Sequence, residues 1–376
     1  MKKIMIIFGT RPEAIKMAPV INVLKKEKEI ETIVCSTGQH REMLKQVLDI
    51  FDIEIDYDLD LMRPNQDLFD ISVNTLTKLK EVLTTHTPDI LMVQGDTSTA
   101  FISALASFYK RIKIAHVEAG LRSYNINSPY PEEANRRFIS VISDYNFTPT
   151  EDSKQNLINE GFPKENIYVT GNTVIDALYM IKDKLEDDFV CNKTEEEINL
   201  STQTDLFEKP FILVTMHRRE KFGDEFKSVL YTIKEIALQR PQYNFIYPVH
   251  LNPNVQGPVN EILKGVNNIK LIPPQDYFKF IYLMSKCLFI MTDSGGVQEE
   301  CFVFEKPVIV LRDVTERNEA IKAGYAFLVS SNSSLIKEKF FEIEENLKTG
   351  YNYFACENPF GNGKSAYLIK NILLNN

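Results

Sequence analysis

The sequence predicts an α/β protein with two doubly wound domains that face each other across a cleft. Three observations lead to this fold class. Short apolar runs alternate with helical segments along the chain, the second half repeats the layout of the first, and 376 residues suffice for two domains. Apolar strands bounded by Gly, Pro and Asp, with helices between them, indicate parallel sheets that are buried on both faces.

The first half of the chain contains six predicted strands, most of them separated by amphipathic helices. Helical spacing of apolar residues is clear in 14–26, 42–51 and 68–83. The first apolar run is too short for a signal peptide, so we interpret it as a strand. The strands lie near 4–8, 32–36, 90–94, 113–117, 145–148 and 167–170.

The second half opens with a helix that we expect to begin near Thr173. The acidic, weakly periodic segment 186–209 is expected to be an exposed connection. Six strands are then predicted near 211–215, 244–249, 269–272, 288–292, 308–311 and 325–329. The last helix, 364–374, is expected to return the chain to the first domain. The predicted domains are 1–171 with 364–376, and 172–363.

Composition and charge exclude several classes of protein. The formal net charge of −9 argues against a nucleic-acid partner, so a phosphate ligand would need a local cluster of cations. No apolar run approaches the length needed to insert into a membrane. The five cysteines and five histidines show no metal-site spacing, so we expect reduced thiols, no metal and a cytoplasmic location.

The turn at Ser294-Gly295-Gly296 follows an apolar run and precedes a segment with helical spacing. A glycine turn at a helix N-terminus exposes backbone N–H groups and the positive end of the helix dipole, so it favours a phosphate. Glycine also allows a ligand to approach the backbone closely. Glu300 could then accept hydrogen bonds from sugar hydroxyls. The alternative is an ordinary strand-to-helix turn.

Cations and carboxylates follow the predicted strands of the first domain. Arg11 and Lys16 flank a helix N-terminus, a place suited to a diphosphate, or they are surface cations. Asp96 and Glu118 each end a strand beside a glycine, where carboxylates are often functional. The alternatives are a helix cap for Asp96 and an ion pair with Arg122 for Glu118. We therefore predict that the residues at these strand ends bind an anion and transfer protons.

Glu132 opens a further helix, in the segment 128–137. Its spacing to Arg136 is i,i+4, and Glu133 has the same spacing to Arg137, so a solvated salt-bridge face is the alternative to a functional carboxylate. In the second domain, His217-Arg218-Arg219 and Arg312 also end strands. Cations on both sides of a cleft, with carboxylates on one side, suit a nucleotide diphosphate leaving group beside proton transfer.

Ten segments together resemble the bacterial non-hydrolysing UDP-N-acetylglucosamine 2-epimerases, in the order of that family and over nearly the whole chain. Gln94 stands where the family usually has His, and 301–305 also depart from its pattern. The segments are 8–19, 38–44, 95–101, 116–123, 128–137, 169–178, 217–220, 247–255, 292–300 and 306–317.

The resemblance implies two Rossmann-like domains, as in GT-B glycosyltransferases, and interconversion of UDP-GlcNAc and UDP-ManNAc for cell-surface polysaccharide. It also implies a homodimer, activated by UDP-GlcNAc near Gln39, Glu42 and 63–66. The implied acid/base residues are Asp96, Glu118, Glu132 and His217. The implied UDP-binding residues are Arg11, Lys16, His217, Ser294, Gly295, Gly296, Glu300 and Arg312.

The expected mechanism follows from the weak acidity of the proton on C2, which is not adjacent to a carbonyl. Transient oxidation would need a nicotinamide cofactor, and the sequence has no dinucleotide fingerprint, so we expect no cofactor. The remaining route eliminates UDP to a glycal and adds it back, with closure of the domains retaining UDP. The competing interpretations are a GT-B glycosyltransferase, a hydrolysing epimerase and an inactive nucleotide-sugar sensor.

Overall fold

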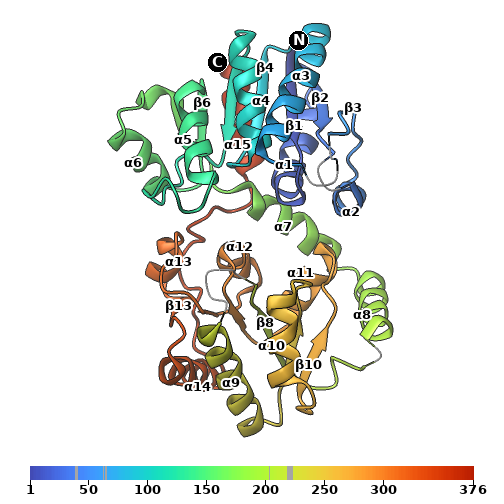
Figure 1. The fold of residues 1–376 in the computed structure, drawn as a ribbon, viewed down its shortest axis with the longest axis vertical. Coiled ribbons are helices and arrows are strands. Elements are labelled where there is room, and N and C mark those ends of the chain that lie inside the picture. Colours follow the sequence, from blue (N-terminus) through green and yellow to red (C-terminus); the bar gives the residue numbers. More distant parts are fainter. Residues whose placement is uncertain (39–40, 62, 64–65, 203, 218–222) are drawn as a thin grey trace. The chain divides into compact units, whose positions relative to one another are not determined.

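The computed structural model describes residues 1–376 with the exception of 39–40, 62, 64–65, 203 and 218–222. The side chains of 41–43 are also outside the description. The chain forms two compact units, which are described separately here (Figure 1). Unit 1 comprises Met1–Met180 and Phe360–Asn376, and unit 2 comprises Ile181–Pro359. The predicted domain boundaries, after residue 171 and before residue 364, stay a prediction.

Unit 1 contains a parallel sheet of seven strands in the order β3-β2-β1-β4-β5-β6-β7. All six predicted strands are confirmed within a few residues. The seventh, β3, was not predicted because it is two residues long, too short for any apolar pattern. The strands are β1 Lys2–Phe8, β2 Ile30–Ser36, β3 Tyr57–Asp58, β4 Ile90–Gln94, β5 Lys113–Val117, β6 Tyr145–Thr148 and β7 Ile167–Val169.

The helices of unit 1 confirm the predicted alternation with strands. Residues 4–8 of β1 and all residues of β4 are buried, as expected for a sheet covered on both faces. The helices are α1 Arg11–Lys25, α2 Arg41–Phe51, α3 Leu68–His86, α4 Ser98–Tyr109, α5 Glu132–Ile142, α6 Glu151–Asn159, the 3-10 helix Lys164–Asn166, α7 Thr173–Lys184, whose last residues belong to unit 2, and α15 Ser365–Asn375.

The C-terminal helix α15 returns to unit 1 and packs against α1, as predicted. Lys2 Nζ donates to the Leu373 carbonyl at 2.6 Å. The buried Asp176 carboxylate accepts from the backbone N–H groups of Ser365 (3.2 Å) and Ala366 (2.9 Å) at the start of α15. The last segment of the chain is therefore part of the first Rossmann-like unit.

Unit 2 contains a parallel sheet of six strands in the order β10-β9-β8-β11-β12-β13. Each predicted strand is again confirmed. The strands are β8 Phe211–Thr215, β9 Asn244–Pro248, β10 Ile269–Ile272, β11 Ile290–Thr292, β12 Val308–Val310 and β13 Ala326–Leu328. The helices are α8 Asp188–Thr202, α9 Asp224–Gln239, α10 Pro253–Leu263, α11 Tyr277–Lys286, α12 Gly295–Glu300, the 3-10 helix Cys301–Phe304, α13 Asn318–Lys322 and α14 Ser333–Thr349.

The prediction that 186–209 is an exposed connection was wrong, because much of it forms helix α8. Ile198 on α8 is fully buried. The acidic side chains that suggested a solvated segment contact α11: Tyr282 donates to Glu195 at 2.8 Å, and Lys279 pairs with Glu197 at 3.1 Å. The buried residues of α8 are only Thr194 and Ile198, so the apolar periodicity of this segment is too weak to predict a helix.

Both sheets are doubly wound, and the strand order reverses beside β1 in unit 1 and beside β8 in unit 2. Ligands of such sheets bind at the carboxyl ends of the strands near this switch point. Arg11 and Asp96 follow the switch-point strands β1 and β4. His217 and Ser294 follow β8 and β11. The topology therefore places predicted site residues at both switch points.

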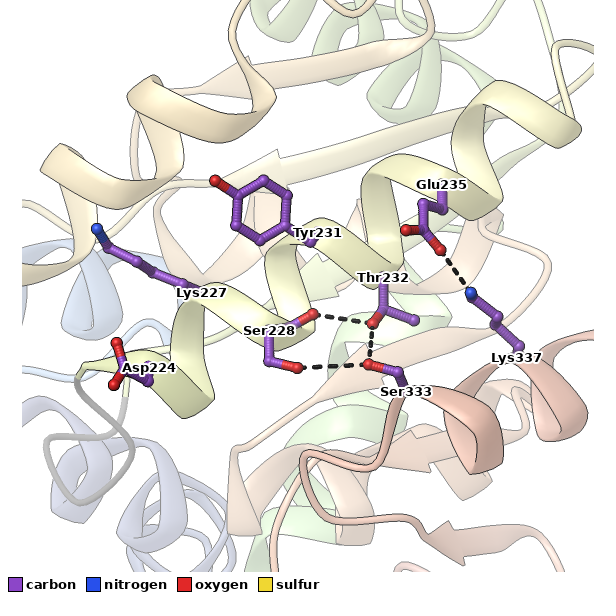
Figure 2. A pocket seen from close by; sticks show the side chains of 8 residues that line it. All are labelled: Asp224, Lys227, Ser228, Tyr231, Thr232, Glu235, Ser333 and Lys337. Carbon is purple, nitrogen blue, oxygen red and sulfur yellow. Dashed lines mark hydrogen bonds and ion pairs between the residues drawn. The ribbon is translucent and has the colours of Figure 1, made fainter.

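A pocket of about 440 Å³ lies elsewhere in unit 2, between α9 and α14 (Figure 2). Its charged groups include the ion pair of Lys337 and Glu235 at 2.5 Å, and Thr232 Oγ1 donates to Ser333 Oγ at 2.7 Å. None of the predicted site residues that the structure describes lines this pocket. No helix among the described residues is long and apolar enough to cross a membrane.

Candidate active site

The first turn of the candidate site joins β1 to α1. Thr10 caps α1, and its side chain and that of Glu13 form a reciprocal capping box. Pro12 lies in the first turn, where its missing N–H costs no hydrogen bond. Arg11 is the half-buried first residue of the helix, and its guanidinium has no ion pair with the described residues. It is thus placed to meet an anion at a helix N-terminus.

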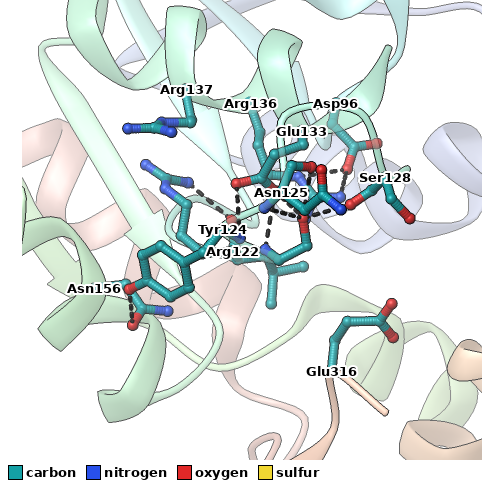
Figure 3. Close-up of polar contacts among 12 residues, drawn as sticks. Asp96, Arg122, Tyr124, Asn125, Ser128, Glu133, Arg136, Arg137, Asn156 and Glu316 are labelled. Atoms are coloured by element: carbon teal, nitrogen blue, oxygen red, sulfur yellow. Dashed lines mark hydrogen bonds and ion pairs between the residues drawn. The ribbon is translucent and has the colours of Figure 1, made fainter. Parts of the chain in front are cut away.

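Asp96 lies just after β4, in an ion pair with Arg136 of α5. Arg136 donates to one carboxylate oxygen through Nε, at 2.9 Å, and through Nη2 (Figure 3). The Asn135 side chain donates to the Asp96 carbonyl at 2.9 Å. The alternative that Asp96 caps the next helix is wrong, because Thr97 is that cap and accepts from the Ala100 N–H at 3.0 Å. Two side chains of α5 therefore hold this partly exposed carboxylate and its backbone in place.

Glu118, directly after β5, is held by a cation and an amide. Lys16 Nζ lies 2.7 and 2.6 Å from its two carboxylate oxygens, and the Gln94 side-chain amide also donates to it. The alternative ion pair between Glu118 and Arg122 is wrong, because Arg122 donates to Glu160 through two bonds of 2.9 Å. Lys16, predicted to bind UDP, is thus brought to a predicted acid/base residue.

The predicted carboxylate Glu132 is the half-buried first residue of α5, and among the described residues it has no hydrogen bond or ion pair. The alternative of an i,i+4 salt-bridge face is wrong here, because Arg136 turns to Asp96 and to Glu133, 3.4 Å away. Glu133 is buried and accepts from the backbone N–H groups of Ser123 (3.0 Å) and Tyr124 (3.3 Å). Glu132 therefore remains available for a ligand.

Two buried residues that support these turns were not predicted. Glu13 accepts a hydrogen bond from Thr97 at 2.7 Å in addition to capping α1, and burial raises its pKa. His116 Nε2 lies 2.8 Å from the Gly95 carbonyl, and burial lowers its pKa to about 4, so the neutral ring donates this bond. A Glu three residues after Thr10 is a recognisable capping-box signal, whereas nothing local marks His116.

In unit 2, the strand, glycine turn and helix predicted around Ser294 are present. Ser294 is the N-cap of α12, and Gly295 and Gly296 are its first two residues. A Cβ built on Gly296 would meet only a Glu300 carboxylate oxygen, at an ordinary 3.7 Å. The fold itself therefore accepts a side chain at 296, so close packing does not require glycine there. The same distance places the Glu300 carboxylate beside the turn.

Gln298 is a buried support of this turn that sequence reasoning missed. Its side-chain amide donates to the Ser294 carbonyl at 3.1 Å and accepts from Thr315 Oγ1 at 2.8 Å. Tyr325 donates to its backbone carbonyl at 2.9 Å. An isolated glutamine carries no local sequence signal, so only the tertiary contacts identify it.

His217 follows β8 and is joined to the end of β11 by Asp293. The buried Asp293 carboxylate accepts from the His217 backbone N–H at 2.8 Å and lies 3.5 Å from its Nδ1. The His217 ring stacks on His250, with centroids 5.7 Å apart and an interplanar angle of 16°. Asp293 therefore fixes the position of the His217 backbone and lies on the Nδ1 side of its ring.

Arg312, predicted to bind UDP, is buried and bonded to Glu316 at 2.9 and 3.3 Å. Burial by itself raises the pKa of Glu316, but the hydrogen bond from Arg312 and the charge of Arg317 outweigh burial and lower it to about 2. Arg317 also donates to Glu299 at 2.7 Å. These contacts make Arg312 part of an ionic cluster that supports the loop after β12.

Several predicted residues lie outside the described part of the chain. They include Gln39 of the predicted regulatory site, the side chain of Glu42, and the two arginines after His217, Arg218 and Arg219. The predictions for these residues therefore stay predictions.

Comparison with known proteins matches the chain over its full length. A sequence profile described as UDP-N-acetylglucosamine 2-epimerase matches residues 22–374. A UDP-N-acetylglucosamine 2-epimerase from Campylobacter jejuni is 49% identical over 378 residues, which cover 99% of this chain and 97% of the relative. The crystal structure of UDP-GlcNAc 2-epimerase from Neisseria meningitidis bound to UDP-GlcNAc is 47% identical, with 100% of both chains covered and a TM-score of 0.91. The Methanocaldococcus jannaschii UDP-GlcNAc 2-epimerase in complex with UDP-GlcNAc and UDP is 34% identical, with 100% of both chains covered and a TM-score of 0.80.

Proposed function

Because this chain belongs to the UDP-N-acetylglucosamine 2-epimerase family, its activity is the 2-epimerisation of UDP-GlcNAc, and we propose that it proceeds by elimination and re-addition of UDP. A carboxylate removes the proton on C2 while the bond from C1 to the UDP oxygen breaks, which leaves a glycal and UDP. UDP then adds back to C1 as a proton is delivered to the opposite face of C2.

The observation that carries this proposal is the pair of carboxylates after adjacent strands of unit 1. The register of β4 and β5 pairs Gln94 with Val117, so the two strands end side by side. Asp96 and Glu118 follow these ends, and each is held by a cation. Both are thus oriented for proton transfer, and we assign Glu132 as the third acid/base group. His217 is the further acid/base candidate, from unit 2.

Stabilisation of the departing UDP is the second task. We assign Ser294, Gly295 and Gly296 to the diphosphate, because backbone N–H groups at a helix N-terminus stabilise developing negative charge. Glu300 beside this turn accepts from the ribose hydroxyls. We also assign Arg11 and His217 to the phosphates of UDP. Lys16 and Arg312 complete the set of UDP-binding residues, and both are held in place by their ion pairs with Glu118 and Glu316.

Incubation with UDP-GlcNAc alone in D2O tests the reaction. We expect formation of UDP-ManNAc with deuterium at C2, because re-protonation uses solvent-exchanged protons. A glycosyltransferase without acceptor would neither form UDP-ManNAc nor incorporate deuterium at C2. An inactive sensor would bind UDP-GlcNAc without turnover. Release of free ManNAc and UDP would instead indicate a hydrolysing enzyme.

The residue assignment is tested by Asp96→Asn and Glu118→Gln in purified protein. Each change removes the ability to accept a proton while keeping the size of the side chain, so we expect kcat to fall by about 100-fold or more. Retention of near wild-type epimerisation by either variant would contradict its assignment, even though the family activity stands.

We also propose that the protein is a homodimer, as the resemblance implies, with the exposed apolar face of α3 and α5 as the interface. These exposed apolar side chains, called the α3–α5 face below, are Phe69, Val73, Phe138 and Val141, and α4 packs against both helices. Exposed apolar patches mark association surfaces. Regulation by UDP-GlcNAc near Gln39 and Glu42, and a cytoplasmic location, complete the proposal.

A further inference from the structure

The carboxylate of Glu13 joins two turns of unit 1 that lie far apart in sequence. Its Oε2 accepts from the backbone N–H groups of Gly9 (2.9 Å) and Thr10 (2.7 Å), in the turn after β1. Its Oε1 accepts from the hydroxyl of Thr97 (2.7 Å), 84 residues away in the turn after β4. The residue is 2% exposed, so solvent does not compete for these bonds.

A helix cap alone does not require the second of these connections. In the capping box of α3, for example, Asp70 accepts from the Asp67 N–H at 3.1 Å, within its own turn. Glu13 makes the equivalent bond with one oxygen, and its other oxygen accepts from Thr97 in the turn after the neighbouring strand β4. Because β1 and β4 are adjacent at the switch point of the sheet, the bond spans the two turns where ligands of such folds bind.

We propose that Glu13 is a positioning residue for the epimerisation, which sets the distance between the turn that carries Arg11 and the turn that carries Asp96. Arg11 directly follows Thr10, and Asp96 directly precedes Thr97, so both ends of the bridge adjoin a residue of the proposed site. The inference rests on the proposed roles of Arg11 and Asp96. A displacement of about 1 Å between groups that act together can lower a rate by about 100-fold.

The bridge can be broken at its far end without touching Glu13. Thr97→Val removes the hydroxyl that reaches Glu13, whereas Thr97→Ser keeps it. Because Thr97 also caps α4, the matched control is Thr150→Val, which removes the corresponding cap hydroxyl of α6, an acceptor from the Ser153 N–H at 3.1 Å. Both valine variants lose one N-cap, but only Thr97→Val loses the bridge.

Steady-state kinetics with UDP-GlcNAc on folded, purified variants supply the test. We expect Thr97→Val to lower kcat by about tenfold or more with KM changed less than threefold, while Thr97→Ser and Thr150→Val stay within about twofold of wild type. Glu13→Asp, whose side chain is one methylene too short to span both turns, should lower kcat in the same way. This second variant keeps the test decisive if Thr97→Val does not fold.

An equal effect of Thr97→Val and Thr150→Val on kcat, or a wild-type kcat in Glu13→Asp, would overturn the inference. Asp96→Asn measured in parallel separates this outcome from a failure of the proposed function. If Asp96→Asn is inactive while the bridge variants are normal, only the positioning role is lost. If Asp96→Asn itself is active, the assignment of Asp96 fails and the bridge has no catalytic group to position.

Discussion

Glu118 combines a strained backbone with a buried charge. Its φ of 69° lies in the left-handed region, which costs a residue with a Cβ about 1–3 kcal/mol. The carboxylate is kept in this position by Lys16 and Gln94. The Lys16 side chain is 19% exposed, so this ion pair is partly buried, and together with the Gln94 amide it fixes the carboxylate in place. Strain of this kind is common at functional sites.

The glycine at 296 provides a prediction at the scale of a single residue. The nearest neighbour of an added Cβ would be a Glu300 oxygen at 3.7 Å, and alanine favours the helix, so Gly296→Ala should keep or slightly raise the melting temperature. The methyl group would occupy the space assigned to the diphosphate. We expect the Kd for UDP, measured by calorimetry, to rise about tenfold or more, that is by about 1.4 kcal/mol. Unchanged UDP binding would remove this turn from the site.

The buried His116 predicts a pH dependence of stability. Its pKa is about 4 in the folded protein and about 6.5 when unfolded, so the unfolded state binds the proton first. The stability contribution is complete above pH 6.5 and is lost as the pH falls toward 4, by about 2 kcal/mol at pH 5. Urea unfolding at pH 7 and pH 5 should show a smaller loss for His116→Gln than for wild type. An equal loss would assign the effect to other groups.

At the scale of elements, α8 shows how a helix can be stabilised by one narrow face and by its charges. Ile198 is fully buried, whereas Glu195 and Glu197 contact α11. Most helical stability in proteins comes from such packing rather than from propensity. Acidic side chains of this segment thus help to join α8 to α11, and its acidic composition does not mark an exposed connection.

Substitutions in α8 test this explanation. Ile198→Ala removes a fully buried side chain and should lower the free energy of unfolding by about 2–5 kcal/mol. Glu196→Ala, on the exposed face of the same helix, should change it by less than about 0.5 kcal/mol. Chemical denaturation of the two variants makes the comparison. Similar stabilities would show that α8 contributes little to unit 2.

At the scale of the whole molecule, the same doubly wound plan occurs twice and presents different chemistry each time. Unit 1 places Arg11 and Asp96 at its switch point, with Glu118 after the next strand, and unit 2 places a glycine turn and a histidine at its own switch point. Parallel sheets position residues of different strands together because all their strands end at one edge. This repetition provides two separate edges, which the proposed reaction uses for proton transfer and for UDP.

The α3–α5 face gives a prediction for the assembly. Phe69 is 81% exposed and Val73 is 61% exposed, one helical turn apart on α3. Two carboxylates in their place would have to be buried at an apolar interface, so Phe69→Glu with Val73→Glu should yield a monomer. Sedimentation or light scattering measures the mass, with Leu200→Glu on exposed α8 as the control. A dimer that survives the double substitution would place the interface elsewhere.

Much of the candidate site was predictable because it lies at strand ends. Asp96, Glu118, Ser294 and His217 each follow an apolar run, and that local pattern is visible in sequence. Their partners were not predictable. Lys16 and Glu118 are 102 residues apart and Arg136 and Asp96 are 40 apart, so no local spacing connects them. The expected local pairs, such as Glu118 with Arg122, proved wrong for the same reason.

The sequence by itself determined where most strands and helices lie, that the last helix belongs to the first unit, and which turns carry glycine and charge, but it missed β3 and α8. It did so because burial on both faces requires continuous apolar runs and turns require particular residues. Only the tertiary structure decided which charge meets which carboxylate, that Glu13 joins two turns, and that Arg312 supports a loop. These contacts depend on how segments far apart in sequence pack together, and no local spacing of residues predicts that packing.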